Sequence, residues 1–143
     1  MATVRLGRTE LVVDKNGFGA LPIQRVTKEE AARLLRKAVD GGMNYIDTAR
    51  AYSDSEEKIG YALADRRHEL VIATKTMAST AAELREQLET SLRNMKTDYI
   101  DVYQLHNPPY CPVPGDEAGL YDALAEAKRQ GKIRFIAITN HRL

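Results

Sequence analysis

Asp47 and Tyr52 place a carboxylate and a phenol at the exit of one predicted strand. Residues 44–49 form a short run with β character that contains the acid, and the tyrosine follows five residues after it. Such a pair suggests catalysis when a base and an electrophile reach it from other parts of the chain. Lys75 and His106 are the two candidates for these roles.

Polar residues recur at the same end of four successive predicted strands. They are Asp47, Lys75, His106 and Asn140. Any one of them has a structural explanation, such as a turn cap, a solvent-directed ammonium or a hydrogen-bonded histidine. In a barrel of parallel strands, however, the C-terminal ends of the strands carry the active site. The recurrence at one end therefore favours a site.

Strands and helices alternate along the chain to position these residues. Strands are predicted at residues 44–49, 70–76, 99–106 and 133–139, and helices at about 54–64, 80–96 and 117–130. Residues 70–74 and 133–138 are mostly continuous apolar runs, which is typical of parallel strands covered by helices. Residues 107–115 hold four of the five prolines and form a long connection, so we expect a rim loop there.

Two helix starts carry the pattern of a capping box, in which a small polar residue precedes an acid by three positions. The pairs are Thr27 with Glu30, and Ser53 or Asp54 with Glu56 or Glu57. The first predicts a helix that begins at about residue 28 and ends at the glycine pair 41–42. The second predicts that the helix after Tyr52 is capped locally.

The repeat length favours half of a (β/α)8 barrel. Five strands begin near residues 17, 44, 70, 99 and 133, a repeat of 26 to 34 residues, whereas a complete barrel takes about 250 residues, or roughly 31 per unit. A doubly wound sheet fits the same length, but no GxGxxG follows the first strand and no P-loop is present. The expected fold is α/β, a partial (β/α)8 TIM barrel with about strands 1 to 5 and an N-terminal β-hairpin. Residues 1–143 are expected to form one domain.

Composition excludes several classes of partner. The chain has 143 residues, 43% of them hydrophobic, and a formal net charge of +1 with its basic residues scattered, so nucleic acid and anionic membranes are poor candidates. No apolar run approaches the roughly 18 residues of a membrane span, and the first residues lack the hydrophobic stretch expected of a signal peptide. The single cysteine, Cys111, has no partner for a disulfide or a metal site. A soluble, cytoplasmic protein is expected.

Motifs in order along nearly the whole chain resemble the N-terminal half of an aldo-keto reductase. They are Gly17-Phe18-Gly19, Tyr45-Ile46-Asp47-Thr48-Ala49 with Tyr52, Glu56-Glu57-Lys58-Ile59-Gly60, Ala73-Thr74-Lys75, residues 92–101, Gln104-Leu105-His106, Gly131-Lys132-Ile133-Arg134 and Ile138-Thr139-Asn140. Residues 19–26 and 52–56 are particularly similar to bacterial members of that family with a C-terminal iron-sulfur extension. The resemblance implies reduction of an aldehyde or ketone with NADP(H).

The same resemblance assigns site residues. Asp47, Tyr52, Lys75 and His106 match the family's catalytic tetrad, and Gly19, Ala20, Asp47, Thr139 and Asn140 fall where the family contacts the nicotinamide end of NADP(H). No metal ligand is implied. Strands six to eight lie outside these residues, and with them the residue that stacks on nicotinamide and the loop that grips the adenosine 2′-phosphate. We therefore expect most of the cofactor site outside this chain.

The chemistry asks for these residue types. Hydride transfer to a carbonyl leaves negative charge on oxygen, so a proton donor and hydrogen-bonding groups must meet it. A free tyrosine has a pKa near 10, and an ammonium about 4 Å from a phenol favours its ionised form by roughly 4 kcal/mol at an effective dielectric of about 20. Lys75 would thus prepare Tyr52 as the acid. Asp47 would orient Lys75, and neutral His106 would position the carbonyl.

Two alternatives stay open beside a reductase. Some members of this fold are regulatory subunits with vestigial catalysis, and a short chain could also be an interaction module without activity. The expected partners are a small carbonyl substrate and either a second copy of the chain or the missing C-terminal half, because half a barrel leaves strand edges unpaired. The isolated 143 residues are expected to lack activity.

Overall fold

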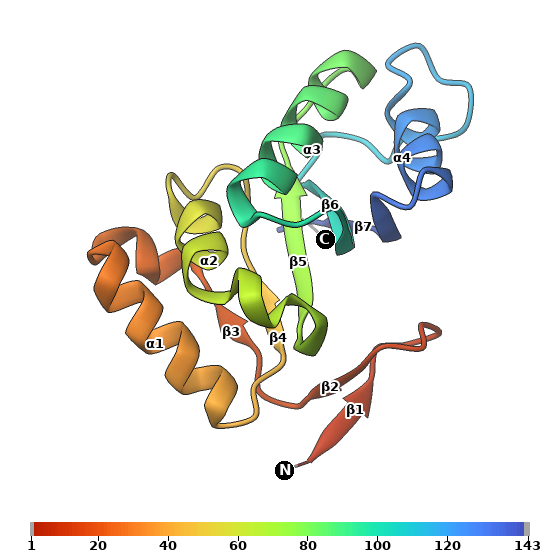
Figure 1. The fold of residues 1–143 in the computed structure, drawn as a ribbon. Helices are drawn as coiled ribbons and strands as arrows, with labels where there is room; N and C mark the ends of the chain where they lie inside the picture. The colour runs from red at the N-terminus through yellow and green to blue at the C-terminus, as the bar shows by residue number, and fades with distance from the viewer. Residues whose placement is uncertain (1, 142–143) are drawn as a thin grey trace.

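Five parallel strands form the centre of the molecule. The computed structural model describes residues 2–141, and the strands lie side by side in the order of the sequence (Figure 1). They are β3 (Phe18–Gly19), β4 (Tyr45–Asp47), β5 (Val71–Thr76), β6 (Ile100–His106) and β7 (Ile133–Thr139). Every neighbouring pair is parallel, so the carboxyl ends of all five strands lie along one edge of the sheet.

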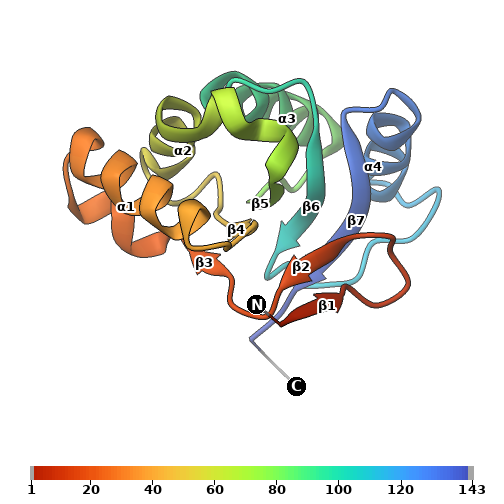
Figure 2. The ribbon, with the colours of Figure 1, turned by 60° about the horizontal axis from the view of Figure 1, so that its bottom comes forward.

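The helices lie along one face of this sheet. They are α1 (Lys28–Asp40), α2 (Ser55–Leu63), α3 (Ala81–Met95) and α4 (Leu120–Arg129), with the short 3₁₀ helices η1 (Leu21–Arg25) and η2 (Ala64–Glu69). Figure 2 shows α1 to α4 in an arc outside a curved sheet. A doubly wound fold would put helices on both faces, whereas an outer ring of helices is the barrel arrangement. This confirms the predicted partial barrel.

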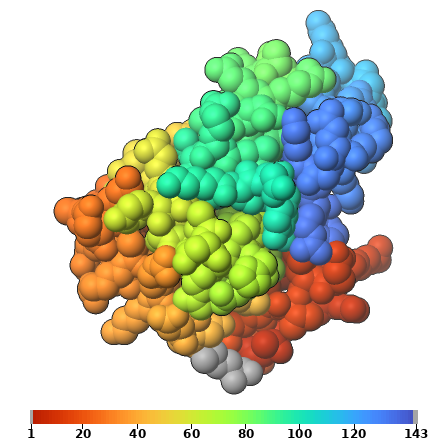
Figure 3. All heavy atoms as spheres, in the orientation of Figure 1, coloured from red at the N-terminus to blue at the C-terminus, as the bar shows by residue number. Residues whose placement is uncertain are grey.

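The core fills the space between the sheet and its helices. Apolar stripes on α1 and α3, among them Leu35, Leu84 and Leu88, are almost completely buried against strand residues such as Ile72. In the space-filling view the segments that contain α1 to α4 form a continuous outer surface (Figure 3). Each of these helices therefore buries one apolar face against the sheet.

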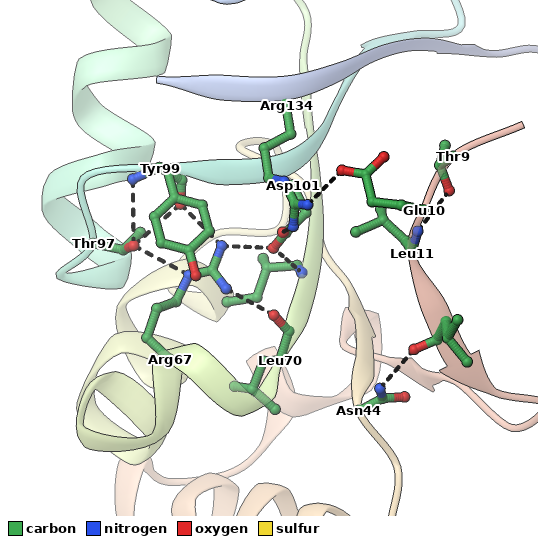
Figure 4. A network of polar contacts seen from close by, with 12 residues as sticks. Thr9, Glu10, Leu11, Asn44, Arg67, Leu70, Thr97, Tyr99, Asp101 and Arg134 are labelled. Atoms are coloured by element: carbon green, nitrogen blue, oxygen red, sulfur yellow. Dashed lines mark hydrogen bonds and ion pairs between the residues drawn. The ribbon is translucent and has the colours of Figure 1, made fainter. Parts of the chain in front are cut away.

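The N-terminal hairpin packs near the amino-terminal ends of the strands of the sheet. Its strands are β1 (Thr3–Arg5) and β2 (Val12–Asp14), which pair antiparallel as predicted. Leu11 and Val13 form a small second cluster with Val71 of β5. A chain of ion pairs also holds the hairpin there, since Arg134 on β7 contacts both Glu10, at 2.7 Å, and Asp101, at 2.9 Å (Figure 4).

Two predicted segments are shorter than expected. A strand was predicted to begin near residue 17, but only Phe18–Gly19 is a strand and the chain then enters η1, which has Pro22 in its first turn. A fixed proline φ suits a helix start better than a strand. The last helix begins at Leu120 and not at 117, because Gly119 adopts a positive φ of 65° and donates to the Asp116 carboxylate at 2.8 Å.

The capping box predicted for α2 is wrong. Asp54 is its N-cap, but neither that side chain nor Ser53 makes a cap hydrogen bond. The Asp54 carboxylate instead pairs with Lys58 at 2.9 Å, and Glu56 is completely buried. The box predicted at Thr27 is present, with the Thr27 hydroxyl accepting from the backbone of Glu30 at 3.2 Å.

The two outer strands of the sheet, β3 and β7, each pair on one side only within residues 2–141. The predicted rim loop follows β6 and connects it to α4, at the carboxyl-terminal edge. Among the described residues, no helix combines the length and apolarity that crossing a membrane requires.

Candidate active site

The four tetrad residues meet at the carboxyl-terminal edge of the sheet. Asp47 is the last residue of β4, Lys75 the last but one of β5, and His106 the last of β6. These strands are direct neighbours in the sheet, and Tyr52 reaches the same edge from the loop between β4 and α2. The structure therefore brings together four side chains that are far apart in the sequence.

Lys75 is held by two acceptors. Its Nζ donates to Asp47 Oδ1 at 2.5 Å and to the carbonyl oxygen of Thr48 at 2.7 Å. The residue is only 5% exposed, and a buried ammonium is costly unless it is paired and hydrogen-bonded. The ammonium is thus fixed in place by the end of β4.

Tyr52 lies over this ammonium. Lys75 Nζ is 5.2 Å from the centre of the phenol ring. The backbone around the tyrosine forms a tight turn, since Tyr52 N donates to Ala49 O at 3.0 Å and Ser55 N donates to Tyr52 O at 2.9 Å. The phenol therefore stands next to a positive charge on a well-hydrogen-bonded loop.

His106 faces Tyr52 from β6. Its ring lies 6.0 Å from the Tyr52 ring, edge to face. Burial, together with the nearby positive charge of Lys75, lowers the pKa of His106 below its ordinary value, so the imidazole is neutral at pH 7. Its buried Nδ1 has no partner among the described residues. A neutral imidazole has one N–H to donate, and the imidazole ring of His106 lies next to the phenol ring of Tyr52.

Gln104 is a site residue that the sequence analysis did not identify. Its Nε2 donates to Asp47 Oδ2 at 3.3 Å, so the Asp47 carboxylate is held by Lys75 on one oxygen and by Gln104 on the other. Gln104 precedes His106 by two positions on β6, and alternate residues of a strand share a face. That spacing was the signal available in the sequence.

The predicted cofactor residues line the same edge with different exposure. Gly19 lies opposite Asp47 in the sheet register, and a Cβ built on it would meet nothing within 4 Å. Ala20 is completely buried, and its N–H donates to Asp47 O at 2.8 Å. Thr139 lies opposite His106, and its hydroxyl accepts from Asn107 N at 3.1 Å.

These residues suit the nicotinamide end of a dinucleotide. The surface beside Gly19 is open, and the exposed Asn140 comes directly after β7. An amide side chain can both donate to and accept from a carboxamide. The residues present therefore fit the group chemically.

A cavity of about 210 Å³ opens beside His106. The turn after β5 lines one wall, including Met77, and the rim loop lines the other, including Pro108 and Tyr110. Its walls are mostly apolar side chains, so an apolar surface lies next to the histidine.

Comparison with known proteins supports one family. The model of the Aldo/keto reductase family matches residues 15–143. The chain is 32% identical over 152 residues to the uncharacterized oxidoreductase YqkF of Bacillus subtilis, covering 96% of this chain and 48% of that protein. It is 32% identical over 126 residues to the methylglyoxal reductase DkgA of Escherichia coli, covering 86% of this chain and 45% of that protein.

A solved structure agrees. An aldo-keto reductase from Klebsiella pneumoniae in complex with NADPH superposes with a TM-score of 0.83 at 30% identity, covering 96% of this chain and 49% of that one. The chain thus spans about half the length of the relatives it matches. The finer similarity to members with an iron-sulfur extension stays a prediction. From its family match, its relatives and its barrel-type sheet, the chain belongs to the aldo/keto reductase family.

Proposed function

We propose that this chain carries the proton-transfer site of an NADPH-dependent reductase of small aldehydes or ketones. The observation that carries the proposal is the convergence of Tyr52, Lys75 and His106 within one group of contacts, 5.2 Å from ammonium to phenol ring and 6.0 Å between the two rings. A phenol with an ammonium and a neutral imidazole beside it is suited to protonate an oxygen that gains negative charge.

Each side chain has one task in this proposal. Tyr52 donates its proton to the carbonyl oxygen, and Lys75 stabilises the phenolate that remains. Asp47 holds Lys75, with Gln104 holding the free oxygen of Asp47. His106 donates a hydrogen bond to the same carbonyl oxygen and orients it. A bound nicotinamide would supply the hydride.

The cofactor is NADPH in this proposal because a relative of the same fold is solved with NADPH. Gly19, Ala20, Asp47, Thr139 and Asn140 would hold its nicotinamide end, which would supply the hydride. The polypeptide of residues 1–143 holds contacts for this end alone, so on its own it binds NADPH more weakly than millimolar and turns nothing over. The cytoplasmic location stays a prediction.

The experiment is an assay of NADPH oxidation by the intact protein with a panel of aldehydes and ketones. Consumption of NADPH that depends on the carbonyl, and is faster than with NADH, is the expected result. An intact protein that binds NADPH but oxidises it with no member of the panel would overturn the proposal and favour a regulatory role. A fluorescence titration giving micromolar NADPH affinity for residues 1–143 would overturn the weak-binding statement.

A further inference from the structure

A carboxylate without any exposed surface lies behind the site. Glu56, in the first turn of α2, is 0% exposed. Burying an ionised carboxylate is expensive unless hydrogen-bond donors and an opposite charge satisfy it. Its neighbours supply both. The donors are Arg50 Nη1, Thr74 Oγ1 at 2.7 Å, Ser91 Oγ at 2.7 Å and Asn94 Nδ2 at 3.3 Å.

These donors come from three different segments. Arg50 belongs to the loop that carries Tyr52, Thr74 is the β5 residue directly before Lys75, and Ser91 and Asn94 belong to α3. Glu56 therefore connects the tyrosine loop to the lysine strand and fastens both to a helix. Glu56 is not one of the four tetrad residues, and its side chain has no exposed surface that a ligand could contact.

Gly60 lets α3 come close enough to complete the set. It lies one turn after Glu56 on α2, and a Cβ built on it would stand 2.2 Å from Asn94 O and 2.8 Å from the Met95 backbone. Only a glycine allows that contact between the helices. The resulting approach brings Ser91 and Asn94 within hydrogen-bond distance of the Glu56 carboxylate.

Arg50 connects Glu56 to the backbone on both sides of Tyr52. Its guanidinium pairs with Glu56 through one nitrogen and donates to Ser53 O at 3.3 Å through the other. Its backbone N–H donates to Lys75 O at 3.0 Å. The residues two before and one after the tyrosine are thus tied together across it. Ser53 also has a positive φ of 41°, a conformation that a non-glycine residue adopts only when its surroundings impose it.

We infer that Glu56 is a positioning residue for Tyr52, acting through Arg50 on the loop that carries the phenol and through Thr74 on the strand that carries Lys75. The inference rests on the proposed function for its catalytic consequence. The structural link itself is independent of that function. A misplacement of about 1 Å in a catalytic group can cost about a hundredfold in rate, so a loosened loop should lower kcat.

The matched pair of variants is Glu56→Gln and Glu57→Gln. Both remove one charge from the same turn of α2, but Glu57 is exposed. In Glu56→Gln the amide NH₂ can face the Thr74 and Ser91 hydroxyls, which rotate to accept, whereas Arg50 loses its charged partner. The buried polar groups around residue 56 thus keep their hydrogen bonds. The contact weakened is the one through Arg50, which holds the loop.

Two readouts on the intact protein separate positioning from general stability. Peptide-level hydrogen exchange over residues 48–55 should accelerate at least about tenfold in Glu56→Gln, while β6 is unchanged. With the best carbonyl substrate, kcat should fall at least about tenfold with the KM for NADPH within about twofold. Glu57→Gln should change neither. Unchanged exchange over this loop, or faster exchange with an unchanged kcat, would overturn the inference.

Arg50→Lys guards against a Glu56 variant that does not fold. It keeps a positive charge beside the buried Glu56 carboxylate, but it loses the two-nitrogen fork that joins Glu56 to the carbonyl oxygen of Ser53. The same local acceleration and the same loss of kcat are expected. The double variant should be no worse than either single one, since both remove one connection; additive losses would contradict the mechanism. If the intact protein reduces no carbonyl, the proposed function fails, and the exchange experiment still decides whether Glu56 holds the loop.

Discussion

The phenol ring of Tyr52 meets the imidazole of His106 edge to face, with 6.0 Å between ring centres and 85° between ring planes. One ring comes from the loop after β4 and the other from the end of β6. The two rings are therefore neighbours although they come from different segments. A single carbonyl oxygen can receive a proton from one and a hydrogen bond from the other, which is the arrangement that carbonyl reduction requires.

Tyr52→Phe removes the proton donor and keeps the ring that packs against His106. We expect kcat of the intact protein to fall by about 10² to 10⁴-fold, with NADPH affinity nearly unchanged, because the hydroxyl acts on the substrate oxygen. Tyr61→Phe, at a tyrosine 46% exposed on α2, is the control. Steady-state rates of Tyr52→Phe within about threefold of the parent would remove the phenol from the role of acid.

The protonation of His106 gives a second test. Burial and the charge of Lys75 lower its pKa, so the unfolded chain binds the proton more readily than the folded one. Below about pH 6.5 the free energy of unfolding should therefore decrease as the pH falls towards the folded pKa. An NMR titration should place the His106 midpoint below about 6.5.

Lys75→Met should raise the pKa of His106. The variant removes a positive charge that opposes protonation, and it leaves Asp47, whose charge favours the imidazolium, without that counterion. The same NMR titration measures the change. Lys28→Met, at a lysine that packs over Tyr61 on the helical side, should leave the midpoint where it was. An unchanged or lower midpoint in Lys75→Met would contradict the electrostatic explanation.

Much of the fold could be predicted from the sequence because the signals for strands and helices lie in short stretches of neighbouring residues. Strand and helix periodicity, and the polar residue closing each strand, were enough to expect the sheet order and the shared edge of Asp47, Lys75 and His106. Parallel strands with short repeats leave few other arrangements. The structure confirms the partial barrel and brings these residues together.

The parts that sequence reasoning missed depend on partners distant in the chain. Glu56 has the spacing of a capping-box acid, yet its donors include Thr74 and Ser91, 18 and 35 residues away. Gln104 had no assigned role because its contact with Asp47 spans 57 residues. Hydrogen bonds of this kind appear only once the sheet and helices are assembled. A local motif therefore gave the wrong partner for Glu56.

Arg67 forms a buried ion pair with Asp101, near the amino-terminal end of β6. Its Nη2 lies 2.6 Å from Asp101 Oδ2, with the two side chains 10% and 1% exposed (Figure 4). Arg67→Met should lower the free energy of unfolding by about 3 kcal/mol, the lower end for breaking a buried pair, because Arg134 still contacts Asp101. Urea denaturation measures the loss.

Arg36→Met is the matched control, since Arg36 pairs with Asp65 at 3.0 Å and both side chains are largely exposed. Exposed pairs contribute little, so this variant should unfold at the urea concentration of the parent. Equal losses of unfolding free energy in the two arginine variants would show that burial does not set the contribution of the Arg67–Asp101 pair to stability.

The edges of the sheet predict how the polypeptide of residues 1–143 behaves when it is prepared alone. In the described structure β3 and β7 each have one neighbour, and Ile138 on β7 is 45% exposed. An unpaired edge with apolar side chains is a template for another strand, and a two-fold contact can satisfy one patch with its own copy. We therefore expect a homodimer, a larger oligomer or aggregation, measured by light scattering.

Ile138→Lys tests whether the β7 edge is responsible. A lysine on an edge strand disfavours edge-to-edge pairing, so this variant should shift the distribution towards monomer. Tyr121→Lys, at a residue of α4 that is 37% exposed, changes the charge equally without touching a strand and should leave the distribution as it is. A parent that scatters as a monomer, unfolds cooperatively and binds no hydrophobic dye would contradict the prediction, because such a chain has its sheet edges and inner face protected within a single copy.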